Sequence, residues 1–302
     1  MGARYLPRAI EKTLRRAASQ FPAVLLSGAR QSGKTTLLKR LFARSHRFVS
    51  FDLPEIEEFA VRDPNLFLER NPPPIVLDEV QRVPTLLRYI KERIDRKRST
   101  PGQYIMSGSQ VFALMKGESE SLAGRIAVLD LATMSAGEQD GLGTTWPLPP
   151  TGLLGRKDTA LSGGSGAGRV LGRMLRGGFP ELVVRADVDR RLWYELYVRT
   201  YLERDVSSVR RVSDLRDFRR FIVALATRAR QLLRLSEVAR ELGVAVNTVK
   251  AWVSVLEASH QIFLLQPYFA NLGKRLVRSP KVYFNDTGLL CHFWAFGTRT
   301  RC

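Results

Sequence analysis

Eight residues near the amino terminus have the types and the spacing that bind phosphate groups. Residues 28–35 read Gly-Ala-Arg-Gln-Ser-Gly-Lys-Thr and follow an apolar run at 23–26. In such a G-x-x-x-x-G-K-T loop the backbone N–H groups surround phosphate oxygens, and the positive end of the following helix adds to the attraction. Lys34 is expected to reach the β- and γ-phosphates, and the Thr35 hydroxyl to bind Mg²⁺. The predicted nucleotide-binding residues are Gly28, Ala29, Arg30, Gln31, Ser32, Gly33, Lys34, Thr35 and Thr36.

Two adjacent carboxylates follow a second apolar run. Residues 75–79 read Ile-Val-Leu-Asp-Glu, and a strand buried on both faces of a parallel sheet has this continuous apolar character. Ligands of open α/β sheets lie beyond the carboxyl ends of the strands, so Asp78 is expected to hold the water shell of Mg²⁺. Glu79 is expected to act as a general base on the attacking water; the alternative is a solvated loop acid. The pair favours hydrolysis by water over phosphoryl transfer to a small molecule.

Apolar runs alternate with helical spacing through the first half of the chain. Strands are predicted at 23–27, 47–53, 75–77, 104–107 and 126–131, and helices at 1–20, 35–43 and 85–96. Strands that alternate with helices form βαβ units and a parallel sheet. One strand separates the two motifs along the chain, which is typical of P-loop ATPases with an additional central strand and a catalytic glutamate. The predicted fold class is therefore α/β, a parallel-sheet P-loop NTPase, followed by a mostly helical domain.

Two more polar residues in this half are candidates for the reaction centre. Ser109 follows the strand at 104–107, where a polar side chain would lie between the two motifs and orient water near the γ-phosphate. The alternative is an ordinary Ser/Gly turn. Arg125 precedes the strand at 126–131 and is a candidate for contacting phosphate or for acting in trans on a neighbouring subunit. The alternative is an arginine of the protein surface.

The second half is predicted to be mostly helical and to contain a helix-turn-helix at 235–252. Gly243 fits the sharp turn between the two helices. The segment at 261–267, followed by Tyr268, could supply a wing strand. The residues expected to face outward and contact DNA are Asn247, Thr248 and Lys250. The alternative is a winged helix that serves only protein packing.

The predicted organisation has four segments. They are a P-loop ATPase domain at 1–136, a Gly/Pro-rich linker or loop at 137–170, a helical domain at 171–290 with the winged helix-turn-helix at about 216–268, and an atypical tail at 291–302. The linker is inferred from its glycines, prolines, serines and threonines.

Composition limits the cellular setting. No apolar stretch approaches the ~18 residues that cross a bilayer, and residues 1–20 lack the apolar region and cleavage site of a signal peptide. The only cysteines are Cys291 and Cys302, which suggests a reducing compartment. We therefore expect a cytoplasmic protein without a membrane partner. The net charge of +19 favours contact with nucleic acid, although the arginine bias of a GC-rich genome produces the same charge.

Eight segments of the chain jointly follow one family pattern. They are residues 21–22, 28–37, 77–84, 107–109, 121–125, 177–180, 201–206 and 281–289. Over about residues 1–290 the chain resembles the prokaryotic AAA-like P-loop ATPases that carry a C-terminal domain of unknown function. The resemblance implies ATP and Mg²⁺ as ligands. It also implies that Ser109 is a sensor and Arg125 an arginine finger.

Two segments depart from that family pattern. The Gly-rich stretch at 141–170 does not follow the usual connection, and the family normally continues beyond residue 290 into a domain that resembles restriction-type nucleases. The end of the chain is therefore expected to be a truncation or a frameshifted tail. The strand at 281–284 is then expected to lack sheet partners and to leave apolar surface exposed.

These observations predict Mg²⁺-dependent ATP binding and hydrolysis that drives a conformational change in the helical, winged-helix domain. Two alternatives stay open, namely an ATP-gated DNA-binding switch and a protein-interaction module with little turnover. The expected partner is ATP; double-stranded DNA, a partner protein and a second copy of the chain are further candidates. GTP is not expected, because the sequence has no N-K-x-D motif that reads guanine.

Overall fold

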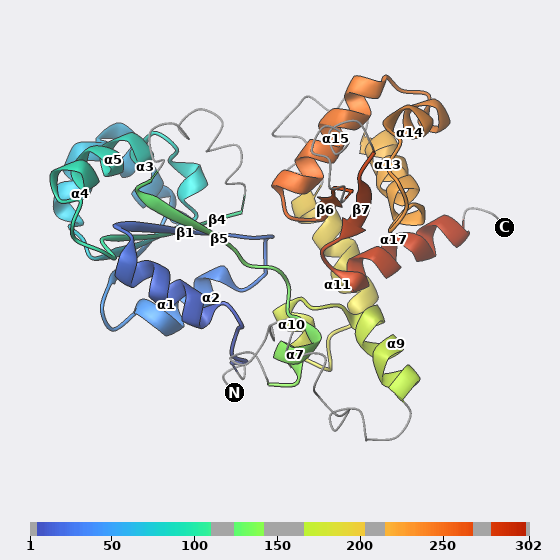
Figure 1. Cartoon of the computed structure of the whole chain (residues 1–302), viewed down its shortest axis with the longest axis horizontal. Coiled ribbons are helices and arrows are strands. Elements are labelled where there is room, and N and C mark those ends of the chain that lie inside the picture. Colours follow the sequence, from blue (N-terminus) through green and yellow to red (C-terminus); the bar gives the residue numbers. More distant parts are fainter. Residues whose placement is uncertain (1–4, 110–123, 142–165, 203–214, 268–278, 300–302) are drawn as a thin grey trace. The chain divides into compact units, whose positions relative to one another are not determined.

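The chain folds into two compact units, Arg4–Leu153 and Leu154–Cys302. The computed structural model describes residues 5–109, 124–141, 166–202, 215–267 and 279–299 (Figure 1). The division between the units falls within the residues 137–170 that the sequence marks as a linker. Among the described residues, no helix has the length and apolar character that crossing a membrane requires.

The first unit is built on a five-stranded parallel sheet. Its strands are β1 (Ala23–Ser27), β2 (Arg47–Ser50), β3 (Ile75–Asp78), β4 (Tyr104–Gly108) and β5 (Ile126–Asp130). Their spatial order is β2-β3-β4-β1-β5, and every neighbouring pair is parallel. Strand β4 therefore lies between β1 and β3, as the additional central strand should. The predicted α/β parallel-sheet fold is confirmed.

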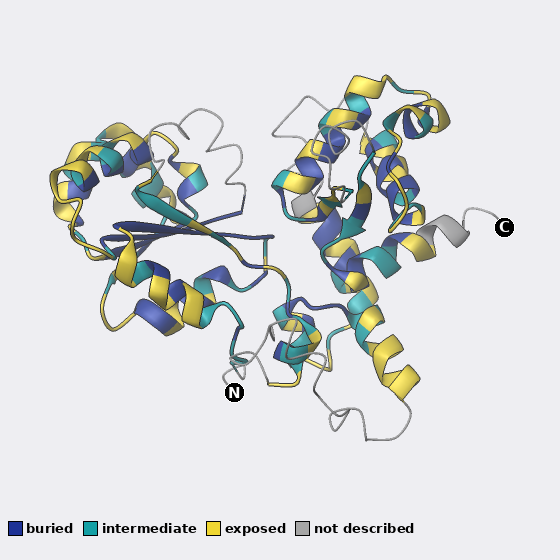
Figure 2. Cartoon of the chain, in the orientation of Figure 1, coloured by how far each residue is buried: buried dark blue, intermediate teal, exposed yellow. Residues whose placement is uncertain are grey.

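Helices cover both faces of this sheet (Figure 1). The covering helices are α1 (Glu11–Gln20), α2 (Lys34–Phe42), α3 (Pro54–Arg62), α4 (Pro64–Arg70) and α5 (Leu86–Arg96). The unit also contains the short helices η1 (Val80–Arg82) and α7 (Ala136–Gln139). Because side chains alternate along a strand, Val24 and Leu26 pack with α1 and α2, whereas Ala23 and Leu25 pack with the apolar residues of α3, α4 and α5. Figure 2 shows β1, β3 and β4 as buried, as expected for a sheet with two covered faces.

Several observed bounds differ from the predicted ones. Strand β2 ends at Ser50 rather than at residue 53, because Pro54 begins α3 and proline favours the first turn of a helix. The first helix begins at Glu11, and residues 5–10 instead take a non-helical path. Helix α7, with buried Glu138, belongs to the first unit, so this unit extends past the predicted limit at residue 136.

The second unit is mostly helical. Its elements are α9 (Gly166–Arg176), α10 (Pro180–Val184), α11 (Arg190–Tyr197), the π-helical turn η2 (Val198–Leu202), α13 (Leu215–Thr227), α14 (Leu235–Leu242), α15 (Val246–Ala258), β6 (Ile262–Leu265), β7 (Lys281–Phe284) and α17 (Thr287–Arg299). Its core holds buried aromatic side chains, with Trp252 of α15 packed on Phe218 and Phe221 of α13. Buried apolar area of this kind is the main stabilising contribution to such a unit.

The carboxyl-terminal part of the chain corrects two expectations. Strand β7 does not lack partners, because it pairs antiparallel with β6 and Val282 is fully buried. Residues 291–295 are not an atypical tail, since they continue α17 from Leu289, and Phe293 lies in the core of the unit. Leu289 and Phe293 lie one turn apart on α17, so both face the core of the second unit. Residues 300–302 lie outside the described part.

Candidate nucleotide-binding site

Three strand ends bring most of the predicted chemistry to one edge of the sheet. The phosphate loop at 28–33 follows β1, Asp78 is the last residue of β3 and Ser109 follows β4. Because β4 pairs with both β1 and β3, Ser109 lies between the two sequence motifs. Parallel strands present their carboxyl ends together, and this is where open α/β sheets bind ligands.

The phosphate loop is closed tightly on itself. Lys34 begins α2 and is buried, and its ammonium donates hydrogen bonds of 3.0 Å to the carbonyl oxygens of Gly28 and Ala29. A Cβ atom at Gly28 would lie 2.4 Å from the backbone oxygen of Leu131, so the segment after β5 leaves room for glycine alone. The loop therefore has the close backbone packing that its sequence predicts.

The residues at this loop fit a phosphate group. The Ser32 hydroxyl is buried, and within the described residues it has no hydrogen-bond partner. A buried donor without an acceptor is costly, and a phosphate oxygen is the acceptor that a loop ahead of a helix N-terminus attracts. A nine-residue helix, α2, supplies that N-terminus.

The two predicted Mg²⁺ ligands lie in direct contact. The Thr35 hydroxyl donates a 2.8 Å hydrogen bond to one carboxylate oxygen of Asp78. Asp78 is almost fully buried. A hydroxyl and a carboxylate are the hard oxygen ligands that Mg²⁺ takes from proteins, the remaining positions going to water and substrate phosphates. Thr35 and Asp78 thus fit the ion that the sequence predicts.

Ser107 is a site residue that the sequence reasoning missed. Its fully buried hydroxyl donates to the second carboxylate oxygen of Asp78 and accepts a 3.3 Å hydrogen bond from the backbone N–H of Glu79. Asp78 is thereby held between two hydroxyl groups. The signal was present, because Met106 pairs with Leu77 in register and the next residues of the two strands are Ser107 and Asp78. A serine in an otherwise apolar buried strand needs a polar partner.

Gln81 is a second missed residue, and it joins two of the predicted ones. Its side-chain amide donates to a carboxylate oxygen of Glu79 and, at 3.3 Å, to the hydroxyl of Ser109. Glu79 itself has a φ of +59°, in the left-handed region that non-glycine residues rarely adopt. Such backbone strain costs of order 1–3 kcal/mol and is concentrated at functional sites. Glu79, Gln81 and Ser109 therefore form one hydrogen-bonded group beside Asp78.

Arg125 is not brought to the phosphate loop of its own chain. It precedes β5, whose first residue Ile126 pairs with Ala23 at the beginning of β1. Arg125 is therefore level with residue 22, six residues before the loop begins, and a rise of about 3.3 Å per residue separates them by about 20 Å. Its guanidinium instead forms an ion pair of 2.6 Å with Asp95 and holds the pKa of that carboxyl below its usual range. The expectation of a phosphate contact within one chain is therefore wrong, and only the action in trans stays a prediction.

The residues predicted to contact DNA lie in the second unit. Helix α14 ends at Leu242 and is capped by Gly243, whose φ is +71°, and α15 then begins at Val246. Asn247 and Lys250 are exposed, Thr248 is half-buried, and the intervening Val249 is fully buried. The predicted outward face of the second helix is therefore accessible. A two-stranded antiparallel sheet, β6–β7, follows this pair of helices.

Comparison with known proteins agrees with this geometry. Residues 20–139 match the family described as "AAA domain", and residues 169–300 match the "Domain of unknown function (DUF8612)". The Walker-type ATPase paby2304 of Pyrococcus abyssi has a similar fold, with a TM-score of 0.55 and 15% identity over 94% of each chain. The fold and the site therefore define the class of this protein, a P-loop NTPase.

Curated relatives resemble the chain over most of its length. The uncharacterized proteins Rv2008c of Mycobacterium tuberculosis and Mb2031c of Mycobacterium bovis are each 35% identical over 279 residues. The match covers 92% of this chain and 57% of each relative, so the chain spans a little over half of their length. The chain therefore carries an AAA-type P-loop domain followed by a C-terminal domain of unknown function.

Proposed function

We propose that the chain binds ATP with Mg²⁺ at the carboxyl edge of its parallel sheet and hydrolyses it. The observation that carries this proposal is the hydrogen-bonded chain Thr35–Asp78–Ser107, which lies directly beside Glu79. Two hydroxyl groups hold a buried carboxylate next to a second carboxylate at the end of the same strand. A phosphate-binding protein without turnover has no need of the second carboxylate at this position.

Each residue has a definite task in this proposal. The backbone of residues 28–36 and the Lys34 ammonium bind the phosphates. Thr35 and Asp78 hold Mg²⁺, which neutralises charge on the phosphate oxygens. Glu79 accepts a proton from the attacking water as the new P–O bond forms and the bond to the ADP oxygen breaks, giving ADP and phosphate. Gln81 and Ser109 orient the Glu79 carboxylate and the water.

Two variants separate nucleotide binding from hydrolysis. Lys34→Ala removes the phosphate-binding charge, and we expect it to weaken ATP binding in a calorimetric titration. Glu79→Gln keeps the shape of the side chain, and we expect tight ATP binding with turnover lowered 10²-fold or more. Glu58→Gln, at an exposed position of α3, is the matched control and should behave as the wild type. Equal turnover by Glu79→Gln and the wild type would refute the role of Glu79 as general base.

A DNA-binding switch is the second candidate, favoured by the exposed start of α15. Asn247 and Lys250 lie on the accessible face of the second helix of a helix-turn-helix, which is the element that enters the major groove in proteins of this type. In this proposal ATP occupancy changes the position of the helical unit and thereby its affinity for duplex DNA. The +19 net charge supports the electrostatic part of such binding.

The salt dependence of DNA binding tests this second candidate. If Lys250 contacts a phosphate, Lys250→Ala should reduce the slope of log K against log salt by about 1. The control is Arg15→Lys, a charge-conserving change in α1 of the ATPase unit, which should leave the slope unchanged. Binding that is identical with and without ATP would refute the switch and favour a module for protein partners.

A further inference from the structure

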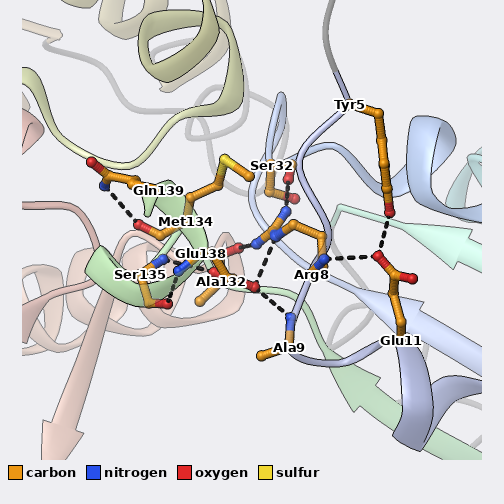
Figure 3. A network of polar contacts seen from close by, with 10 residues as sticks. All are labelled: Tyr5, Arg8, Ala9, Glu11, Ser32, Ala132, Met134, Ser135, Glu138 and Gln139. Atoms are coloured by element: carbon orange, nitrogen blue, oxygen red, sulfur yellow. Dashed lines mark hydrogen bonds and ion pairs between the residues drawn. The ribbon is translucent and has the colours of Figure 1, made fainter. Parts of the chain in front are cut away.

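A buried arginine from the amino-terminal segment braces the phosphate loop from behind. Arg8 is only 4% exposed, although it lies in the non-helical residues 5–10 ahead of α1. Its guanidinium donates hydrogen bonds of 2.9 Å to the backbone oxygen of Ser32, 2.6 Å to that of Ala132 and 3.0 Å to the carboxylate of Glu138 (Figure 3). One side chain thus ties the phosphate loop to the segment that follows β5.

Both members of the Arg8–Glu138 ion pair are fixed by further contacts. One Glu138 oxygen also accepts from the backbone N–H of Ala9 at 2.8 Å, and the other accepts from that of Ser135 at 2.7 Å (Figure 3). The backbone N–H of Arg8 donates to the carboxylate of Glu11, at 2.8 Å. The guanidinium therefore has one position, and charge-assisted hydrogen bonds with such fixed geometry are the strong ones.

The contact with Ser32 orients a donor that the loop needs. The carbonyl of Ser32 and the N–H of Gly33 belong to one planar trans peptide, so they point in opposite directions. When Arg8 holds the carbonyl on its own side, the N–H of Gly33 must point away from Arg8. Loops of this sequence bind the α- and β-phosphates with their backbone N–H groups. A cation on the carbonyl also polarises the peptide and makes that N–H a better donor.

We propose that Arg8 is a positioning residue for the nucleotide phosphates, acting through the Ser32–Gly33 peptide. The inference rests on the proposed function, because it concerns the same phosphate loop. Arg8 does not contact the γ-phosphate in this account, and Glu79 and Ser109 on the neighbouring strands do not depend on it. Its loss should therefore weaken ADP and ATP equally and leave the rate of hydrolysis from the bound state nearly unchanged.

Three variants of the whole chain test the proposal. Arg8→Lys keeps the charge but cannot make the three hydrogen bonds of the planar fork. Glu138→Gln keeps the shape of the side chain but removes the negative charge that holds the guanidinium of Arg8 against Ser32. The matched control is Arg15→Lys, an exposed arginine in α1. Calorimetric titrations with Mg-ADP and Mg-ATP, the kcat at saturating ATP and thermal unfolding without nucleotide are measured for each.

We expect Arg8→Lys to raise the dissociation constants of ADP and ATP by about tenfold each, the value of one charge-assisted hydrogen bond. Its kcat should stay within about twofold of the wild type, Glu138→Gln should show a smaller effect of the same kind, and Arg15→Lys none. A folded Arg8→Lys protein with unchanged affinities would overturn the inference, as would a loss confined to ATP. If Arg8→Lys does not fold, unchanged affinities in Glu138→Gln overturn it. A wild-type chain that binds neither nucleotide overturns the proposed function instead.

Discussion

Ser107→Ala should damage the site more than its small change in volume suggests. The hydroxyl of Ser107 is fully buried at the end of β4 and contacts both Asp78 and the backbone N–H of Glu79. Removing it leaves the Asp78 carboxylate with Thr35 as its remaining hydroxyl donor among the described residues. It also leaves the N–H of Glu79 without the Ser107 oxygen. No backbone atom has to move, so the change isolates the two hydrogen bonds.

The size of the effect follows from the kinds of hydrogen bond lost. A hydrogen bond to a charged group contributes about 1.5–3 kcal/mol, and a neutral bond about 0.5–1.5 kcal/mol. The second bond is long at 3.3 Å, so its contribution belongs to the lower end of that range. We therefore expect the free energy of unfolding to fall by about 2–3 kcal/mol. The melting temperature of a unit of this size should fall by about 4–12 °C.

The functional readout is the Mg²⁺ dependence of turnover. With Asp78 less well oriented, the Mg²⁺ concentration for half-maximal hydrolysis at fixed ATP should rise about tenfold or more, since orienting partners of metal ligands typically contribute 10–100-fold. Ser50→Ala is the control, because Ser50 pairs with Asp78 from the other side in register, while its own hydroxyl accepts from the backbone of Asp52. An unchanged Mg²⁺ requirement together with unchanged stability in Ser107→Ala would refute the reasoning.

Three further predictions concern other parts of the chain. Gly288→Ala should destabilise the second unit by about 1–3 kcal/mol in urea unfolding, because its Cβ would lie 2.2 Å from the Tyr194 hydroxyl oxygen. Gly172→Ala, with open space around it in α9, should be stabilising by about 0.5–1 kcal/mol; equal effects of the two changes would contradict this packing. Burial lowers the pKa of His46 below its usual 6.5, so stability present above that value should be lost as the pH falls through the lowered pKa, and a pH series on His46→Gln should lack this loss. Arg125→Ala should leave the dissociation constant of ATP unchanged in a dilute titration, and a weakened affinity there would contradict its placement at the opposite edge of the sheet.

The parts of the site that the sequence revealed are those encoded by neighbouring residues. The loop at 28–35 and the pair Asp78-Glu79 are continuous segments, and each has a spacing that few other structures require. Their neighbouring apolar runs also located the strands, because a doubly covered strand is continuously apolar. The α/β fold class and the position of the site at the carboxyl edge could therefore be predicted.

The residues that could not be predicted make contacts with partners that are distant in the sequence. Ser107 meets Asp78 only because two strands 29 residues apart are in register, and Arg8 meets Glu138 across 130 residues. Nothing in the local pattern around Arg8 distinguishes it from a surface arginine, whereas the place of Ser107 in an apolar strand indicates a polar partner without identifying it. The error on Arg125 was avoidable, since a residue that precedes a parallel strand lies at the edge opposite to the phosphate loop.

The second unit shows the same limit. The pair of helices α14 and α15 could be predicted because the turn glycine and the buried Val249 and Trp252 lie within one short segment. The partner of the strand at 281–284 could not be seen, because 15 residues separate β7 from β6 along the chain. Pairing between strands depends on register and on the intervening loop, which local patterns do not encode.

In the proposed function, Glu79 drives hydrolysis of ATP bound at the phosphate loop. The most direct test is a single-turnover experiment in which the wild-type chain and Glu79→Gln are each mixed with less than one equivalent of labelled ATP and Mg²⁺. The nucleotide retained by the protein is then identified over time. We expect the wild type to convert its bound ATP to ADP, while Glu79→Gln retains ATP without hydrolysing it. Formation of ADP at the same rate by both proteins would contradict it.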